Sequence, residues 1–161
     1  MPPDRRKTLL VVDSDDEVRE SLTTALRRDY RVLRAATGEA AFQMMQKEDV
    51  DLMLLEADLP GISGFEVLKI VRENYPYVEV IVISNTKELD TAIEAMRHGA
   101  YHYIAKDLDP ESIRTLFANA AERQDLSRDV ARLKAEVAEQ NDREFVVGPS
   151  RSTRAVVELV Q

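Results

Sequence analysis

The chain of 161 residues contains no cysteine and no tryptophan, and it has only two histidines. Without cysteine it can form neither a disulfide framework nor a thiolate metal site, and two histidines alone are too few for a zinc centre. The absence of cysteine is consistent with a cytoplasmic protein. No apolar run approaches the roughly 20 residues that cross a bilayer, and the N-terminal residues lack the layout of a signal peptide. We therefore expect no membrane partner.

Positive charge is also scarce, with 22 lysines and arginines against 30 aspartates and glutamates, a net charge of −8. This balance argues against nucleic-acid binding by this segment, because such binding needs a basic surface. The hydrophobic fraction of 44% and the charged fraction of 32% are typical of a globular protein. The length allows one domain of ordinary size and an appendage.

Apolar runs and helical spacing alternate along the first two thirds of the chain. The runs predict buried strands at 8–12, 30–36, 51–55, 78–83 and 101–105. Helical spacing follows each run, with Thr37 and Asp109 as candidate N-caps and Gly99 as a helix end. Five strand–helix units in series predict an α/β fold with a doubly wound five-stranded parallel sheet. We expect the strand order 2-1-3-4-5, which is one of the common orders of such sheets.

The last helix is unusually long, because residues 111–144 contain neither glycine nor proline. Its first part can pack on the sheet. In its second part an apolar seam recurs at spacings of four, three and four, which is a heptad pattern formed by Leu126, Val130, Leu133 and Val137. Valine at a and leucine at d favour a parallel two-stranded coiled coil, and hence a homodimer. The alternative is a single helix whose apolar stripe rests on another domain.

Polar residues follow four of the five predicted strands. The first strand ends at the acidic stretch 13–16, and the later strands end at Glu56, Ser84 and Lys106. Because ligands bind at the carboxyl ends of parallel strands, these groups are expected to share one cleft. Taken alone, the stretch 13–16 would be an N-cap with an acidic first turn. The hydroxyl and ammonium groups on neighbouring strands favour a pocket, with a salt bridge from Lys106 to Glu56 or Asp13.

These stretches, together with 10–13, 51–64 and 99–106, resemble the receiver domain of two-component response regulators, which has the CheY-like fold. The resemblance covers residues 7–122. It implies that a histidine kinase phosphorylates an aspartate at the end of the third strand, beside Mg²⁺ held by acidic residues. By position, Ser84 is the switch hydroxyl, Tyr103 the switch aromatic residue and Lys106 the phosphoryl-binding lysine. The metal positions are Asp13, Glu56 and Asp58.

The sequence departs from this family at three positions. Glu56 stands where the acceptor aspartate is expected, and its carboxylate reaches about 1.5 Å further. Ser14 follows Asp13 where the family has a second acid, so we expect Mg²⁺ to bind weakly or not at all unless Asp15 or Asp58 compensates. Asp107 replaces a proline, which predicts a trans peptide bond after Lys106.

Several functions are compatible with this pattern. Glu56 can imitate an aspartyl phosphate by reaching Lys106 and Ser84, or the domain is a switch that no longer operates and serves as a scaffold. Both readings are independent of phosphorylation and weaken the case for a histidine kinase as a partner. A third is an ordinary Mg²⁺-dependent relay at a nonstandard site. A fourth is a haloacid-dehalogenase-like phosphatase with Asp13 as its nucleophile and Asp15 as the second acid, although its late acidic pair is missing.

The C-terminal stretch 145–161 resembles the opening of the AAA+ domain of NtrC-type, sigma-54-dependent activators. This suggests a receiver domain at 1–122, a helical coiled-coil linker at 123–144 and a truncated AAA+ domain at 145–161. The resemblance implies a regulator that controls an output ATPase through dimerisation. None of the five glycines lies in a P-loop motif, so this segment is not expected to hydrolyse ATP.

Overall fold

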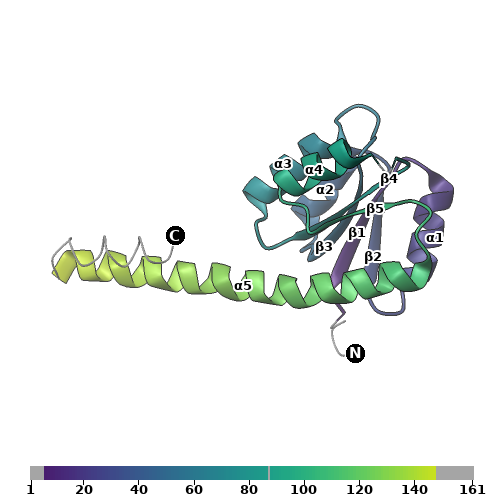
Figure 1. Ribbon diagram of the computed structural model, residues 1–161. Coiled ribbons are helices and arrows are strands. Elements are labelled where there is room, and N and C mark those ends of the chain that lie inside the picture. Colours follow the sequence, from purple (N-terminus) through teal and green to yellow (C-terminus); the bar gives the residue numbers. More distant parts are fainter. Residues whose placement is uncertain (1–5, 87, 148–161) are drawn as a thin grey trace. The chain divides into compact units, whose positions relative to one another are not determined.

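The computed structural model describes residues 6–86 and 88–147, with side chains through residue 138. Its strands are β1 (Thr8–Val12), β2 (Arg31–Ala35), β3 (Leu52–Glu56), β4 (Glu79–Ser84) and β5 (His102–Ala105). They form one parallel sheet in the order β2-β1-β3-β4-β5, shown in Figure 1. The predicted fold class and strand order are confirmed. No strand end differs from its predicted position by more than one residue.

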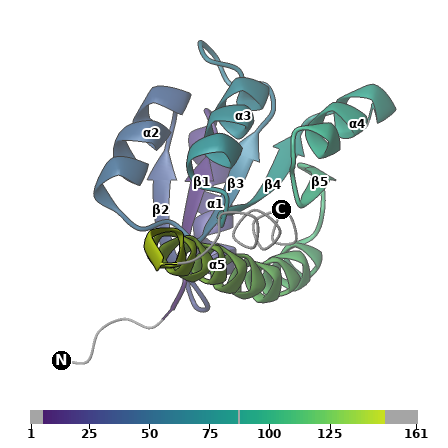
Figure 2. The same ribbon diagram turned by 90° about the vertical axis from the view of Figure 1, so that its left-hand side faces the viewer.

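Helices cover both faces of this sheet. They are α1 (Asp16–Leu26), α2 (Gly38–Lys47), α3 (Gly64–Asn74), α4 (Leu89–Arg97) and α5 (Pro110–Val147). The helices α2, α3 and α4 lie on one face, and α1 with the first turns of α5 lies on the other (Figure 2). Right-handed crossovers between parallel strands produce this doubly wound arrangement.

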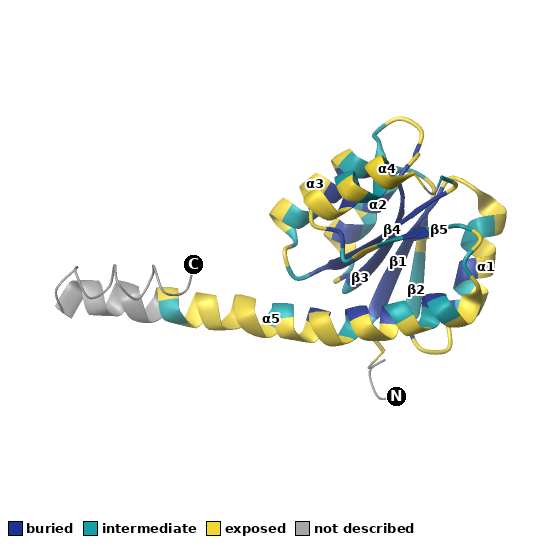
Figure 3. Ribbon diagram, viewed as in Figure 1, coloured by how far each residue is buried: buried dark blue, intermediate teal, exposed yellow. Residues whose placement is uncertain are grey.

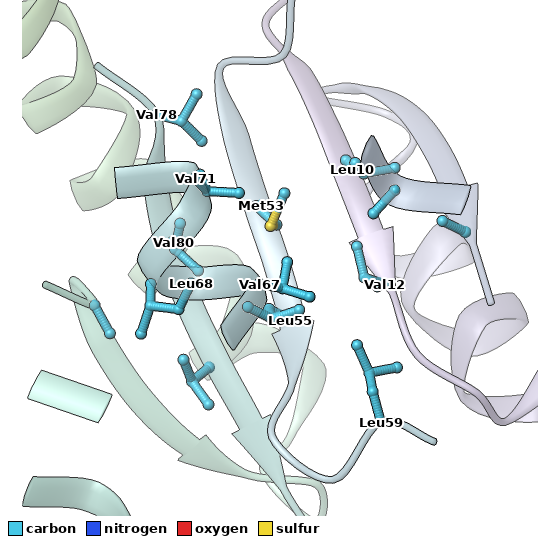
Figure 4. Close-up of a cluster of buried hydrophobic side chains, with 14 of the residues drawn as sticks. Leu10, Val12, Met53, Leu55, Leu59, Val67, Leu68, Val71, Val78 and Val80 are labelled. Carbon is cyan, nitrogen blue, oxygen red and sulfur yellow. The ribbon is translucent and has the colours of Figure 1, made fainter. Parts of the chain in front are cut away.

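The sheet separates two hydrophobic cores. Every residue of β1, β3 and β4 is buried, as the dark ribbons of Figure 3 show. One core joins these strands to α2, α3 and α4 through residues such as Met53, Val67 and Leu68 (Figure 4). The other joins them to α1 and α5 through Leu26 and Phe117. Each fully buried side chain of this size contributes about 1.5–3 kcal/mol of transfer free energy.

Local signals set the helix ends as the sequence predicted. The Thr37 hydroxyl accepts a hydrogen bond from Ala40 N at 3.1 Å and caps α2, and Asp109 accepts one from Ser112 N at the start of α5. Gly99 follows α4 with φ of +94°, a conformation that side-chain-bearing residues rarely adopt. The Lys106–Asp107 peptide bond is trans.

The chain divides into two compact units, one ending at Gln124 and one beginning at Asp125. Helix α5 reaches Val147, three residues beyond its predicted end. Within the second unit, Leu126, Val130 and Leu133 are 65%, 50% and 52% exposed, and Val137 is partly exposed. The coiled coil stays a prediction.

Residues 148–161, most of the predicted AAA+ start, lie outside the described residues. No helix in the described part is long and apolar enough to span a bilayer.

Candidate functional site

The candidate site lies at the carboxyl edge of the sheet, where the polar residues were predicted to meet. Asp13 directly follows β1, Glu56 and Ser84 are the last residues of β3 and β4, and Lys106 directly follows β5. Backbone bonds continue the sheet into the site, with Asp13 N bonded to Ala35 O at 3.1 Å and Lys106 N to Ser84 O at 2.9 Å. The structure brings Asp13, Ser14, Glu56 and Lys106 into direct contact.

Both carboxylate oxygens of Glu56 are occupied by donors from the protein itself. Lys106 Nζ lies 2.5 Å from Oε2. Ser14 donates to Oε1 from its hydroxyl at 2.7 Å and from its backbone N–H at 3.1 Å. Glu56 is only 4% exposed. Its longer side chain therefore crosses the pocket and ends on Ser14, a partner that the sequence reasoning did not assign to it.

Asp13 is completely buried and supports Lys106 from the other side. Its Oδ1 accepts a hydrogen bond from Asp15 N at 2.8 Å, and its Oδ2 lies 3.1 Å from Lys106 Nζ. That Oδ2 receives no well-directed hydrogen bond from the described residues. The Arg19 guanidinium donates to the Asp13 carbonyl oxygen at 2.5 Å. Lys106 thus sits between two carboxylates, and the predicted salt bridge forms with both.

Burial and pairing shift the pKa values of these three groups in different directions. Burial raises the pKa of Asp13, and the nearby charge of Glu56 adds to this. Burial also acts to raise the pKa of Glu56, but the hydrogen bonds from Lys106 and Ser14 outweigh it and the pKa is lowered. For Lys106, burial acts to lower the pKa, and the bonds to Glu56 and Asp13 together raise it. At neutral pH the Glu56–Lys106 pair is therefore ionised.

Ser84 and Tyr103 form a second, separate network. The Ser84 hydroxyl donates to Asp58 Oδ2 at 3.1 Å and accepts from Thr86 N at 3.2 Å. The Tyr103 hydroxyl donates to the Thr86 carbonyl at 2.6 Å, which ties β5 to the segment before α4. The expectation that Glu56 reaches Ser84 as well as Lys106 is wrong, because Ser84 is directed to Asp58.

The donor set does not fit a bound Mg²⁺. The Glu56 carboxylate is held by Lys106 and Ser14, and the Asp13 carboxylate by Lys106 and the backbone. Asp58 is exposed and bonded to Ser84, and Asp15 accepts a bond from Glu17 N as the N-cap of α1. In the described part of the chain no three acidic or histidine side chains converge. Mg²⁺ needs nearly octahedral oxygen ligands, which these separate carboxylates do not provide.

Three residues that contribute to the site were not predicted from the sequence. Gly64 packs the start of α3 on the site, since a Cβ there would lie 2.1 Å from the Glu56 carbonyl oxygen. Thr86 links Ser84 to Tyr103. Its spacing of two from Ser84 is the pattern of a side-chain-to-backbone turn and was the available signal. Nothing in the sequence marked the Arg19 contact.

Comparisons with known proteins identify the family of the chain. Residues 9–118 match the response regulator receiver domain. The hydrogenase transcriptional regulatory protein HoxA of Cupriavidus necator is 32% identical over 83% of this chain and 28% of its own length. A putative response regulator, NtrX-like, of Rickettsia felis is 29% identical over 94% of this chain and 32% of its own length.

Solved structures give the same assignment. The crystal structure of NtrX from Brucella abortus in complex with ADP has a TM-score of 0.73 and 25% identity, covering 80% of this chain and 29% of that one. The chain spans about a third or less of the length of the curated relatives it matches. Because residues 9–118 match the family and the sheet has the corresponding fold, the chain belongs to the response regulator receiver domain family.

Proposed function

We propose that this chain is the regulatory receiver of a sigma-54-dependent transcriptional regulator whose output does not depend on phosphorylation of residue 56. The observation that carries the proposal is the occupation of both Glu56 oxygens, by Lys106 on one side and by Ser14 on the other. A receiver that accepts phosphate needs a free carboxylate oxygen in line with its donor. In this chain both carboxylate oxygens of residue 56 already accept hydrogen bonds from protein donors.

The energetic cost of opening the site supports the same reading. Freeing either oxygen of Glu56 breaks a hydrogen bond to a charged group, worth roughly 1.5–3 kcal/mol. An attacking carboxylate would also lack a divalent cation to offset the charge of the incoming phosphoryl group, because no three acidic or histidine side chains converge in the described part of the chain. Ser14 contributes twice to this arrangement, by binding Glu56 and by removing a carboxylate from the pocket.

Glu56 acts in this proposal as a partial, permanent signal. It binds Lys106, but Ser84 remains bonded to Asp58, so only half of the contacts of a phosphoryl group are reproduced. A carboxylate also carries one charge, against about 1.5–2 for a phosphoryl group. Moving a two-state equilibrium from 1:99 to 99:1 takes about 5.5 kcal/mol, more than these contacts supply. The expected result is a biased equilibrium.

The output proposed here is dimerisation that controls an AAA+ ATPase in the cytoplasm. The NtrX-like relative aligns with 94% of the chain, so the similarity continues beyond the receiver into the linker and the tail. Apolar side chains are available for the dimer on two elements. Leu89, Ile93 and Met96 are exposed on α4, and the seam residues Leu126, Val130 and Leu133 are exposed in α5. The domains proposed are a receiver at 1–122, a linker at 123–144 and an AAA+ start at 145–161.

Treatment with acetyl phosphate or beryllofluoride and Mg²⁺ tests the proposal. The intact mass and the oligomeric state should stay unchanged, while a receiver with the usual aspartate, treated in parallel, changes both. An acyl phosphate on Glu56 would refute the proposal. A phosphoryl group on Asp58, whose carboxylate is exposed beside Ser84, would instead support a relay at a nonstandard site.

Replacement of Glu56 by alanine separates the biased signal from a scaffold. We expect the dimer dissociation constant to change about tenfold, which corresponds to about 1.4 kcal/mol. An unchanged constant, in a protein that stays folded, would leave Glu56 with a structural role only.

No observation favours the phosphatase alternative, since the nucleophile that it requires, Asp13, is 0% exposed.

A further inference from the structure

A polar cluster lies at the opposite edge of the sheet, where the strands begin, and holds the last turn of α5 in the first unit. Arg123 Nε lies 3.6 Å from Oε1 of Glu79, a β4 residue that is 2% exposed. The Arg123 guanidinium also lies 5.5 Å from the centre of the Tyr101 ring. Gln124 is fully buried and accepts a hydrogen bond from Lys7, next to β1. We call Arg123 and Gln124, with these three partners, the α5 clamp.

The clamp has a free-energy cost, because it buries polar side chains. Burying a glutamine or a glutamate is unfavourable unless its polar atoms are paired, and an apolar residue at the same place would pack at lower cost. Gln124 Nε2, moreover, has no hydrogen-bond partner among the described residues. A half-satisfied buried amide is a weak point in a structure. The clamp therefore fixes one position of α5 but holds it only moderately.

Strand β5 connects the clamp to the site. Tyr101 lies immediately before β5, and its N–H donates to Val80 O at 2.7 Å. Tyr103 on the same strand is tied to Thr86, and Lys106 at its other end is bonded to Glu56. The five steps from Tyr101 to Lys106 span roughly 16 Å of extended chain. The contacts of Lys106, Tyr103 and Tyr101 thus link the site to Arg123 along a single strand.

We propose that the α5 clamp couples β5 to α5, so that the state of the Glu56–Lys106 pair changes how firmly the receiver holds the last turn of its α5 segment. The clamp itself is inferred from the contacts of Arg123 and Gln124. Only its coupling to Glu56 depends on the function proposed above. Spatial continuity alone does not establish coupling, so the test must measure an interaction between the two sites.

A double-mutant cycle measured by amide hydrogen exchange of residues 113–124, in the whole chain, provides this test. The four proteins are wild type, Glu56→Ala, Arg123→Ala and the double variant. Arg123→Ala should raise exchange about three-fold, the size of one exposed cation–π contact. Glu56→Ala should raise exchange in the wild-type background and lose most of this effect when Arg123 is absent. Equal effects of Glu56→Ala in both backgrounds would overturn the coupling.

Further variants separate the clamp from its input. Arg132→Ala removes an arginine of the same helix that pairs with Asp129 at 3.7 Å outside the first unit, and it should leave the Glu56 effect unchanged. Arg123→Lys keeps the charge beside Glu79 without the planar group over Tyr101, and it should restore only part of the coupling. Tyr103→Phe perturbs β5 without touching Glu56. If its effect depends on Arg123 while that of Glu56→Ala does not, the clamp is supported and the input from Glu56 fails. If neither depends on Arg123, the clamp proposal is wrong.

Discussion

Replacing Glu56 by glutamine tests the site directly, because the side chain keeps its size and loses only its charge and one acceptor. The two carboxylate oxygens face donors on both sides: Lys106 Nζ at 2.5 Å, and Ser14 Oγ and N at 2.7 and 3.1 Å. A carboxamide has one acceptor end and one donor end. Whichever way it turns, a donor must face a donor on one side of the pocket.

The size of the effect follows from what is lost and what remains. One hydrogen bond to a charged group is worth roughly 1.5–3 kcal/mol. The larger loss of about 3–5 kcal/mol for breaking a buried ion pair does not apply in full, since Lys106 keeps Asp13 at 3.1 Å. We expect the free energy of unfolding to fall by about 2 kcal/mol. At roughly 4 °C for each kcal/mol in a domain of this size, the melting temperature should fall by about 8 °C.

The direction of the pKa shift of Glu56 determines how the stability difference between the variant and the wild type changes with pH. The pKa of Glu56 is lowered in the folded chain, because its bonds to Lys106 and Ser14 outweigh its burial. Its contribution is therefore complete above about pH 4.3, the usual pKa of a glutamate, and is lost as the pH falls through the lower folded value. Glutamine does not titrate, so the gap between the variant and the wild type should narrow in acid.

Thermal unfolding followed by far-UV circular dichroism measures both effects, from neutral pH down to below the folded pKa. Glu94→Gln is the matched control, since Glu94 also pairs with a neighbouring side chain, His98 at 2.8 Å, but its own side chain is 46% exposed. It should change the melting temperature little. A Glu56→Gln protein as stable as the wild type at pH 7, or a gap that stays constant in acid, would show that the buried pair does not stabilise the site.

Three further predictions concern neighbouring positions. Ser14→Ala removes one donor to Glu56 and should lower the free energy of unfolding by about 1 kcal/mol; Ser14→Asp should cost more, and equal losses in chemical denaturation would contradict the Ser14–Glu56 contact. Gly64→Ala places a Cβ 2.1 Å from the Glu56 carbonyl oxygen and should cost about 3 kcal/mol or more, so an unchanged melting temperature would count against this close approach. Leu133→Lys on the exposed seam should convert a dimer to a monomer in light scattering, with Arg132→Ala as the control, and a persistent dimer would exclude the coiled coil.

Much of the fold could be predicted because several local signals agree. The central strands are covered on both faces, so β4 appears in the sequence as an almost continuous apolar run. Thr37 and Gly99 mark helix ends through a hydroxyl cap and a positive φ angle, and both depend on the residue itself. The end of α5 was predicted less accurately. The chain has no helix-breaking residue until Gly148, and the predicted end at 144 came from an expected domain start.

The candidate site divides in the same way. The positions of Asp13, Glu56, Ser84 and Lys106 follow from topology, since the carboxyl ends of parallel strands meet at one edge. The pairing among these residues did not follow from topology. Ser84 turns to Asp58, and Ser14 turns to Glu56. These choices depend on rotamers and on differences of about one carbon–carbon bond, which spacing along a chain does not encode.

The sequence by itself determined the doubly wound sheet, the edge at which the polar groups gather and the unusual acid at position 56. Hydrophobic period and helix caps are properties of residues and their spacing, and a parallel sheet brings the carboxyl ends of its strands to one edge. Only the tertiary structure decided that this acid has both oxygens bound and that no three acidic side chains of the described residues converge. It also placed Arg123 and Gln124 on the far edge of the same sheet. Such contacts join residues distant in the chain, and their energies change over fractions of an ångström, which only the packed fold fixes.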